Sequence, residues 1–421
     1  MRQLYDFQEK ILENVKGKKR VAFYLEMGLG KTYIGSHKVI ELDNPVTLVV
    51  CQKSKVEDWC KHFKEVHPNL DVYDLTNKKE FDKFFKEGVY SVDTIGIINY
   101  DLLIRRPELK ELREFTLMLD ESQAIQNETA KRTKFILKMK PDAVILLSGT
   151  PTGGKYEQLY SQCQLLGWKI SKRVFWDNYI RWYDWYPVQG MFPVKIVTGY
   201  KHVDDLKLNL RLYGAQFLKS EEVLTLPEQV FQEVKVNTSP QYRKFAKNRI
   251  VEINGEILKG DTTFNNLLGL RKLCGAFSSE KLTAFKDLIE STSDRVVVFY
   301  NFWSELEKMK SVIGDRPSCE VNSKHHDLSE FEKNDDCILF INYGSGSSGL
   351  NLQEANKIVY YSPPLSSTNF EQSKKRIHRI GQSKTCFYYF LIAKDSVEEK
   401  IYSMLKDRRD YTEKLFEHDY L

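Results

Sequence analysis

The chain has 421 residues, of which 63 are basic and 58 acidic, and its formal net charge is +5. Apolar residues make up 42% and charged residues 29%, as in an ordinary globular protein. At roughly 150 residues per domain, this length predicts two or three domains that can each bury a core. No apolar run approaches the roughly 18 residues that span a bilayer, so we do not expect a membrane protein. The net charge is too small to indicate nucleic-acid binding by itself.

The N-terminus and the cysteines predict the compartment. The opening sequence, MRQLYDFQEK, lacks a hydrophobic signal region, so we do not expect secretion. The seven cysteines are scattered and none forms a CxxC pair, which excludes a disulfide framework and a zinc ribbon. We therefore expect a cytoplasmic protein.

Short, nearly continuous apolar runs recur along the chain. They are too short for buried helices, are rich in β-branched and aromatic residues, and alternate with amphipathic stretches such as 55–65 and 304–312. Strands buried on both faces and separated by helices are typical of parallel α/β sheets. In chain order, the predicted strands are Val21–Leu25, Val46–Cys51, Thr94–Ile98, Phe115–Leu119, Val144–Leu147, Val296–Phe299, Ile338–Ile341, Ile358–Tyr361 and Phe387–Ile392.

These strands fall into two groups, before residue 150 and after residue 295. Between the groups, the stretches 156–166, 203–212, 241–257 and 263–273 have helical patterns, and strand signals are few. We therefore predict an α/β fold with two parallel-sheet lobes and a helical insertion or linker. The predicted boundaries are 1–155 for the first lobe, 156–278 for the mainly helical region and 279–421 for the second lobe.

A glycine-rich loop, LEMGLGKT from residue 25 to 32, follows the first predicted strand and precedes a helical stretch. Glycines let backbone N–H groups turn towards phosphates, and the following helix N-terminus adds positive potential. In such a loop Lys31 reaches the outer phosphates and Thr32 ligates Mg²⁺. Position 25 is leucine where the strict pattern has glycine, so a simple glycine-rich turn is the alternative. The predicted ATP contacts of the loop are Met27, Gly28, Leu29, Gly30, Lys31 and Thr32.

Two carboxylates, Asp120 and Glu121, end the strand predicted at 115–119. ATPases use such a pair to place one carboxylate on Mg²⁺ and the other against the attacking water. A strand end with solvated acids is the simpler interpretation. Together with Lys31 and Thr32 in the same lobe, the pair predicts ATP hydrolysis, with Asp120 on the metal and Glu121 as the base.

A basic segment, QSKKRIHRIGQ, covers residues 372–382 of the second lobe. On a helix, Gln372, Arg376 and Arg379 are spaced i, i+4, i+7 and share one face. Two guanidinium groups on that face can reach one triphosphate and stabilise the charge that develops on it. A solvated basic helix is the alternative. Because the other lobe carries a nucleotide loop, we predict that both arginines are catalytic.

These motifs resemble those of helicase superfamily 2. The resemblance rests on Asp-Glu-Ser-Gln at 120–123, Ser-Gly-Thr-Pro at 148–151 and the segment 372–382. The sequences EMGLGKT and RIHRIGQ are similar to its Swi/Snf-type DNA translocase family in particular. The resemblance implies two RecA-like lobes with ATP in the cleft between them and a nucleic-acid strand lying across both. Such a motor requires different affinities for DNA in its ATP-bound and ATP-free states.

The resemblance also implies roles for single residues. Gln8 lies in a segment similar to the adenine-reading motif, and Gly349 and Asn351 lie in one similar to the coupling loop of the second lobe. With Gln372 these are the remaining predicted ATP contacts, and Ser148 and Thr150 are predicted to couple hydrolysis to movement. Motif position, together with hydroxyl and N–H groups at loop ends, predicts DNA phosphate contacts. These contacts are Lys53, Ser54, Asn99, Tyr100, Ser345 and Ser347.

Three positions depart from the family pattern. Gly344 stands where arginine is common, Leu365-Ser366-Ser367 where Trp-Asn-Pro is usual, and Ser122 where histidine is common. The first two affect the DNA grip and lobe coupling rather than the ATPase. After two lobes no length remains for a chromodomain, bromodomain or nucleosome-spacing module, so we do not expect chromatin remodelling. A compact phage or mobile-element motor, acting in the cytoplasm of a bacterial host, fits better.

We predict an ATP hydrolase that uses Mg-ATP to translocate along double-stranded DNA and to displace or remodel protein–DNA complexes or branched DNA. Binding is expected to tolerate any sequence and to weaken with salt. One alternative is a true helicase that separates DNA or RNA strands, for which single-stranded DNA is a partner. Another is a nucleotide-gated clamp that recruits a nuclease or replication protein. Because the loop and the arginines share one chain, a monomer suffices.

An aromatic segment at 173–192 is not absorbed by these motifs. It contains Trp176, Trp182 and Trp185 among several tyrosines and Arg181. It is either an element that stacks on bases or separates strands, or a packing brace between the helical region and the first lobe. We favour the brace, because Trp and Tyr dominate packing wherever helices lie on a sheet.

Overall fold

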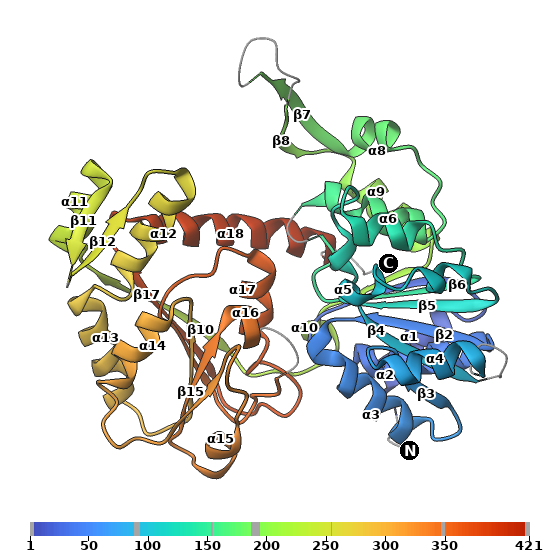
Figure 1. The fold of residues 1–421 in the computed structure, drawn as a ribbon, viewed down its shortest axis with the longest axis horizontal. Coiled ribbons are helices and arrows are strands. Elements are labelled where there is room, and N and C mark those ends of the chain that lie inside the picture. Colours follow the sequence, from blue (N-terminus) through green and yellow to red (C-terminus); the bar gives the residue numbers. More distant parts are fainter. Residues whose placement is uncertain are drawn as a thin grey trace. The chain divides into compact units, whose positions relative to one another are not determined.

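The computed structural model describes residues 4–87, 93–152, 155–186, 194–253, 255–346 and 350–416. The chain divides into two compact units, Met1–Val223 with Asp410–Leu421, and Leu224–Arg409. Each unit is built on one parallel sheet, so the predicted α/β class with two parallel-sheet lobes is confirmed (Figure 1). In the described ranges, no helix has both the length and the apolar character needed to cross a membrane.

The first unit contains a seven-stranded sheet in the order β3-β4-β2-β5-β6-β1-β9. Its five central strands are the first five predicted from the sequence, and they are buried along almost their whole length. Continuous burial explains why these strands show unbroken apolar runs. The bounds are β1 (Arg20–Leu25), β2 (Val46–Cys51), β3 (Asp71–Asp74), β4 (Thr94–Asn99), β5 (Phe115–Asp120), β6 (Ala143–Ser148) and β9 (Ala215–Leu218).

Helices cover both faces of this sheet (Figure 1). On one face, Gly35 of α2 lies against the side chains of Met118 and Leu147. On the other face, α6, α7 and α9 close the main hydrophobic core. The helices are α1 (Asp6–Asn14), α2 (Lys31–Leu42), α3 (Val56–Val66), α4 (Lys78–Lys86), α5 (Tyr100–Leu103), α6 (Lys131–Leu137), α7 (Tyr160–Leu165), α8 (Lys172–Tyr179), α9 (Val203–Leu212) and α10 (Ser220–Val223), with 3-10 turns η1 (Lys53–Lys55), η3 (Pro107–Glu111), η4 (Ser122–Ile125) and η5 (Tyr156–Leu159).

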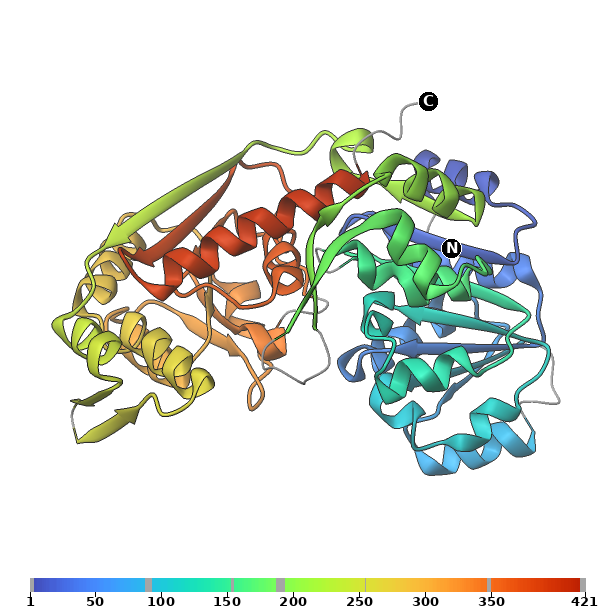
Figure 2. The same cartoon turned by 90° about the horizontal axis from the view of Figure 1, so that it is seen from above.

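The second unit contains a six-stranded parallel sheet in the order β10-β17-β16-β13-β15-β14. Helix α18 carries Ile401, Tyr402 and Leu405 into its core, and Figure 2 shows this helix, in red, running beside β10 and β17. The strands are β10 (Gln229–Val236), β13 (Val296–Tyr300), β14 (Ser318–Val321), β15 (Ile338–Asn342), β16 (Lys357–Tyr360) and β17 (Cys386–Ala393); the helices are α11 (Pro240–Asn248), α12 (Thr263–Cys274), α13 (Ser279–Glu290), α14 (Trp303–Lys310), α15 (Ser329–Lys333), α16 (Tyr343–Gly346), α17 (Ser367–Lys374) and α18 (Val397–Phe416).

The region 156–278 holds more strand than the sequence indicated. Besides its helices it contains β9, β10 and two antiparallel hairpins, β7 (Ile180–Trp185) with β8 (Val194–Tyr200) and β11 (Ile250–Ile253) with β12 (Glu256–Lys259). The helix expected over 241–257 is wrong beyond Asn248. Arg249 takes a left-handed φ of 57°, which ends α11 and starts the hairpin. The Asn-Gly pair at 254–255 was an available hairpin signal.

Candidate active site

The glycine-rich loop connects β1 to α2 and is held by α1. The Nε2 atom of Gln8 donates to the Leu29 carbonyl at 3.0 Å, and its Oε1 atom accepts from the Tyr5 N–H at 3.0 Å. Gly30 has φ +74°, and a Cβ added there would lie 2.3 Å from Gln8 Nε2. The conformation and the close approach both require glycine at this position. The predicted adenine-motif residue therefore touches the predicted phosphate loop directly.

Lys31 begins α2 and reaches back over the loop. Its Nζ atom donates to the Leu25 carbonyl at 2.9 Å and to the Glu26 carbonyl at 3.3 Å. A Cβ on Gly149 would lie 3.4 Å from the same Nζ, so the turn after β6 lies against the loop after β1. Thr32 follows on the first turn of α2.

The carboxylates Asp120 and Glu121 end β5, two strands from β1 in the sheet. Asp120 Oδ2 accepts from the Trp59 indole at 2.9 Å, and Glu121 takes a left-handed φ of 51°. Burial, followed by the charge of Glu121, raises the pKa of Asp120 to about 6, against the opposing effects of the Trp59 hydrogen bond and Lys31. Asp120, the predicted metal ligand, therefore lies within the electrostatic influence of both Glu121 and Lys31.

A chain of hydrogen bonds joins Glu121 to the turn after β6. Gln123 Nε2 donates to Glu121 Oε2 at 2.8 Å, and Gln123 Oε1 accepts from the Ser148 hydroxyl at 2.7 Å. Ser148 Oγ in turn accepts from the Thr150 N–H at 3.0 Å. The two predicted coupling residues are thus connected to the predicted base through one buried amide.

Gln162 of α7 contributes to the site without having been predicted. It is fully buried, and its Oε1 atom accepts from the Tyr24 hydroxyl at 2.9 Å and from the Ser122 hydroxyl at 2.8 Å. Its Nε2 atom donates to the Pro151 carbonyl at 2.8 Å. Ser122 is therefore held inside the unit, where it ties the carboxylate box to β1 and to the turn after β6.

The predicted DNA contacts of the first unit divide by exposure. Lys53 and Ser54 are exposed in η1, directly after β2. Asn99, the last residue of β4, and Tyr100, which follows it, are buried, and the Tyr100 hydroxyl donates to the Asp120 carbonyl at 2.8 Å. Carboxyl ends of parallel strands meet at one edge of a sheet, which explains why loops from β1, β2, β4, β5 and β6 gather there.

The arginine segment of the second unit is not one helix, which corrects the premise of the shared helix face. Helix α17 ends at Lys374, and turns follow through Arg376 and Arg379. The carbonyl of Arg376 accepts from the Leu352 N–H at 3.2 Å, and that of Ile377 accepts from Gln382 Nε2 at 3.2 Å. These bonds occupy the carbonyls that a continuing helix would use.

The turns nevertheless bring both arginines together. Nη1 of Arg376 and Nη1 of Arg379 donate to the same Leu350 carbonyl, at 3.3 and 3.5 Å, and Arg379 also bonds to the Asn351 side chain. Burial lowers the pKa of Arg379, although its guanidinium stays charged at any ordinary pH. Gln372 is buried in α17. Ser345 lies in α16, and Gly349 and Ser347 lie outside the described residues.

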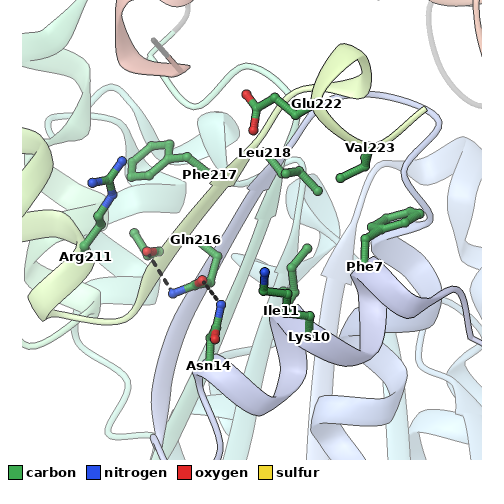
Figure 3. Close-up of a pocket in the computed structure, with 11 residues that line it drawn as sticks. Phe7, Lys10, Ile11, Asn14, Arg211, Gln216, Phe217, Leu218, Glu222 and Val223 are labelled. Carbon is green, nitrogen blue, oxygen red and sulfur yellow. Dashed lines mark hydrogen bonds between the residues drawn. The ribbon is translucent and has the colours of Figure 1, made fainter. Parts of the chain in front are cut away.

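A separate pocket of roughly 390 Å³ lies between α1 and β9 (Figure 3). Phe7, Lys10, Ile11 and Asn14 line it from the helix, and Asn14 donates to Gln216 of β9 at 3.5 Å. Its lining includes none of the predicted ATP contacts. The pocket is therefore separate from the loop that is predicted to bind the nucleotide.

Comparison with known families decides what kind of protein carries this site. The SNF2-related domain matches residues 20–278, and the helicase conserved C-terminal domain matches residues 280–381. The chain belongs to the SNF2 family. The predicted resemblance to Swi/Snf-type members of helicase superfamily 2 is confirmed, and the enzyme class of this family, an ATP-dependent helicase-like hydrolase, is the one predicted.

Several curated relatives resemble this SNF2-family chain. A "SWI/SNF-related matrix-associated actin-dependent regulator of chromatin subfamily A-like protein 1" from Drosophila melanogaster is 23% identical over 98% of the chain and 56% of its own length. An "Uncharacterized ATP-dependent helicase" from Mycoplasma pneumoniae is 22% identical over 94% and 40%. The mouse "DNA annealing helicase and endonuclease ZRANB3" is 23% identical over 92% and 38%. The chain thus spans about half or less of the length of these relatives.

Proposed function

We propose that this SNF2-family chain is an ATPase motor that couples hydrolysis to translocation along double-stranded DNA. The observation that carries the proposal is the buried relay from Glu121 through Gln123 to Ser148, at the sheet edge that also holds Lys31. Glu121, the proposed water-activating residue, is thereby linked to the turn after β6. Movement of that turn together with the neighbouring loops would therefore reach Glu121. Such a link is what coupling of chemistry to motion requires.

The residues present fit Mg-ATP. Gly28 and Gly30 have φ values of 90° and 74°, a conformation that glycine adopts readily and in which backbone N–H groups can turn towards a phosphate. Lys31 holds the outer phosphates, and Thr32 with Asp120 would hold Mg²⁺, which neutralises phosphate charge. Glu121 accepts a proton from the attacking water. Gln8, Met27, Leu29, Asn351, Gln372 and Gly349 are proposed as the further nucleotide contacts.

The second unit supplies the positive charge that the reaction needs. Arg376 and Arg379 stabilise negative charge as it develops on the transferred phosphoryl group, and their common anchor on the Leu350 carbonyl holds the two guanidinium groups together. Their distance from one another is set by this anchor rather than by a helix repeat.

Double-stranded DNA is the proposed track. Exposed Lys53 and Ser54, at the same sheet edge as the nucleotide loop, contact phosphates, and Ser345 and Ser347 do so from the second unit. Asn99 and Tyr100 are buried, so they contribute to this edge of the sheet from beneath the exposed residues. Two relatives are named as an ATP-dependent helicase and a DNA annealing helicase, which supports ATP and DNA as ligands of this chain. A monomer acting in the cytoplasm, without a membrane, is part of the proposal.

The test is the steady-state ATPase rate with no nucleic acid, single-stranded DNA, double-stranded DNA and RNA, each at low and moderate salt. We expect strong stimulation by duplex DNA that weakens as salt rises. Glu121→Gln serves as the inactive control, since it keeps the site's shape and removes the base. Stimulation by duplex DNA moves the next test to displacement of a third strand or a bound protein.

Other outcomes separate the alternatives. Stimulation mainly by single strands contradicts duplex translocation and favours a strand-separating helicase. Absence of stimulation by every nucleic acid contradicts both motors and favours a nucleotide-gated clamp that recruits a nuclease or replication protein.

A further inference from the structure

The described residues of the aromatic segment 173–192 belong to helix α8 and to strand β7 of a hairpin. The two parts differ in how they pack. Phe175, Tyr179 and Ile180 are buried in the core of the first unit, as a packing brace predicts. The hairpin of β7 and β8 then leaves the body of this unit (Figure 1). Residues 187–192 of the segment lie outside the described residues.

One face of the hairpin packs against α8. Trp182 of β7 contacts Trp176 of α8 edge to face, with ring centroids 6.3 Å apart, and Lys195 of β8 lies over the Trp182 ring. Trp182 and its cross-strand partner Val197 are partly buried against the core. This face of the hairpin therefore packs within the first unit, and its cation, Lys195, already contacts the Trp182 ring.

The other face presents a row of side chains to solvent. Arg181, Tyr183 and Trp185 are exposed and share this face, because they alternate along β7 with Ile180, Trp182 and Asp184, of which only Asp184 is exposed. Tyr183 is 51% exposed and Trp185 is 50% exposed. Two large aromatic rings exposed in one row mark this face as a candidate interaction surface.

Chemistry and spacing favour nucleic-acid bases over a protein as the ligand. Residues two apart on a strand are separated by about 6.8 Å, which equals two base-stacking steps of about 3.4 Å. Alternation of aromatic rings with a guanidinium is the composition of surfaces that stack on bases while holding a phosphate. On this face the guanidinium of Arg181 places a positive charge in the same row as the two rings.

We infer that the outer face of the β7–β8 hairpin, made of Arg181, Tyr183 and Trp185, stacks on unpaired DNA bases where a duplex opens into single strands. The inference deepens the proposed function by adding a contact that recognises branched DNA. A fully paired duplex keeps all but its terminal bases stacked within the helix, so we expect the hairpin to contribute little to binding of the duplex.

The test compares the full chain with its Tyr183→Ala/Trp185→Ala variant, without nucleotide, by fluorescence anisotropy. The probes are a fork with two single-stranded arms and a blunt duplex of equal length. We expect wild type to bind the fork more tightly than the duplex. The variant's fork affinity is expected to fall about tenfold or more, while its duplex affinity stays within about twofold.

Two further variants make the result specific. Tyr183→Phe/Trp185→Phe keeps the ring faces and is expected to retain the fork preference. Trp303→Ala removes a 41% exposed tryptophan from α14 in the second unit and is expected to change neither affinity. Coincident thermal unfolding of all four proteins shows that the side chains removed were not structural.

Each remaining outcome overturns the inference. Unchanged fork affinity in the alanine variant excludes base stacking by this face. Equal loss on fork and blunt duplex shows a general phosphate grip instead. Because no ATP is present, a wild type whose ATPase ignores DNA contradicts the proposed motor but leaves this test intact.

Discussion

At the scale of single residues, the proposed phosphate loop depends on one contact between distant parts of the chain. Gln8 holds the Leu29 carbonyl, and only a glycine at position 30 leaves room for the Gln8 amide. The loop conformation is therefore selected jointly by the backbone of Gly30 and by α1. A nucleotide that binds this loop therefore meets a backbone conformation that α1 already holds in place through Gln8.

Replacing Gly30 by alanine tests this dependence. Gly30→Ala adds a Cβ 2.3 Å from Gln8 Nε2, so the amide must leave Leu29, and we expect ATP affinity to fall by at least about tenfold. Gly17→Ala is the matched control, because Gly17 has nearly the same φ, +72°, but open space around it. It is expected to cost about 1–2 kcal/mol of unfolding free energy and to leave ATP binding unchanged. Titration with a fluorescent ATP analogue measures the affinity of both variants, and urea unfolding measures their stability. Equal losses of affinity would show that φ strain alone matters.

The pKa of Asp120 predicts how magnesium binding changes with pH. Burial and Glu121 raise it to about 6, so protons compete with the metal below that pH. We expect Mg²⁺ affinity to be constant above about pH 7 and to fall up to about tenfold per unit below about pH 6. The raised pKa also means that ionised Asp120 destabilises the nucleotide-free fold above pH 6, and that this cost is relieved as the pH falls.

Calorimetric Mg²⁺ titrations between about pH 5 and pH 8, with an unhydrolysed ATP analogue bound, measure the effect. Trp59→Phe removes the hydrogen bond to the carboxylate and is expected to move the transition to higher pH. A transition that stays at the pH of free ATP ionisation would place the metal away from Asp120.

Residues of the site were predictable where a local motif carries them and not where the contact spans the chain. Lys31, Asp120 and Glu121 sit in short patterns after predicted strands. Trp59 and Gln162 reach the site from helices 61 and 40 residues away in the sequence from their partners Asp120 and Ser122. Neither belongs to a spacing pattern, so only the packing of helices on the sheet reveals them.

At the scale of elements, position in the sheet decided which strands the sequence predicts. All nine predicted strands are present. The strands it did not predict include the four at sheet edges, β3, β9, β10 and β14, where exposure interrupts the apolar run. The hairpin strand β7 is also largely exposed, and its charged residues Arg181 and Asp184 likewise interrupt the apolar run.

One buried ion pair joins two elements of the second unit. Lys281 of α13 donates to both carboxylate oxygens of Glu398, at the start of α18, at 2.6 Å, and both side chains are at most 1% exposed. Glu398 also accepts from the Ala393 N–H at 3.1 Å, at the end of β17. The pair therefore fixes α18 to the sheet it covers.

Removing one partner leaves the other charge buried. Lys281→Ala is expected to lower the free energy of unfolding of the second unit by about 3–5 kcal/mol. Lys286→Ala, on the same helix, breaks an exposed pair with Glu290 at 3.7 Å and is expected to cost less than about 1 kcal/mol. Urea unfolding followed by circular dichroism compares the two; similar costs would show that Glu398 regains water when Lys281 is lost.

At the scale of the whole molecule, the charged groups of the proposed reaction are divided between the units. Lys31, Asp120 and Glu121 belong to the first unit, and Arg376 and Arg379 to the second. A group that acts only when charge develops on the phosphoryl group contributes to kcat and little to ground-state binding. The division therefore predicts different kinetic signatures for the two sets of residues.

Arg379→Ala tests that difference with the less buried of the two arginines. We expect kcat for ATP hydrolysis to fall about 10³-fold or more, with affinity for an unhydrolysed ATP analogue within about threefold of wild type. Lys384→Ala, which removes an exposed cation shortly after Arg379, is expected to change neither value. Lys31→Ala is expected to lose both binding and turnover. If Arg379→Ala abolished binding as fully as Lys31→Ala, the arginine would be a ground-state phosphate ligand, and the division of labour between the units would be wrong.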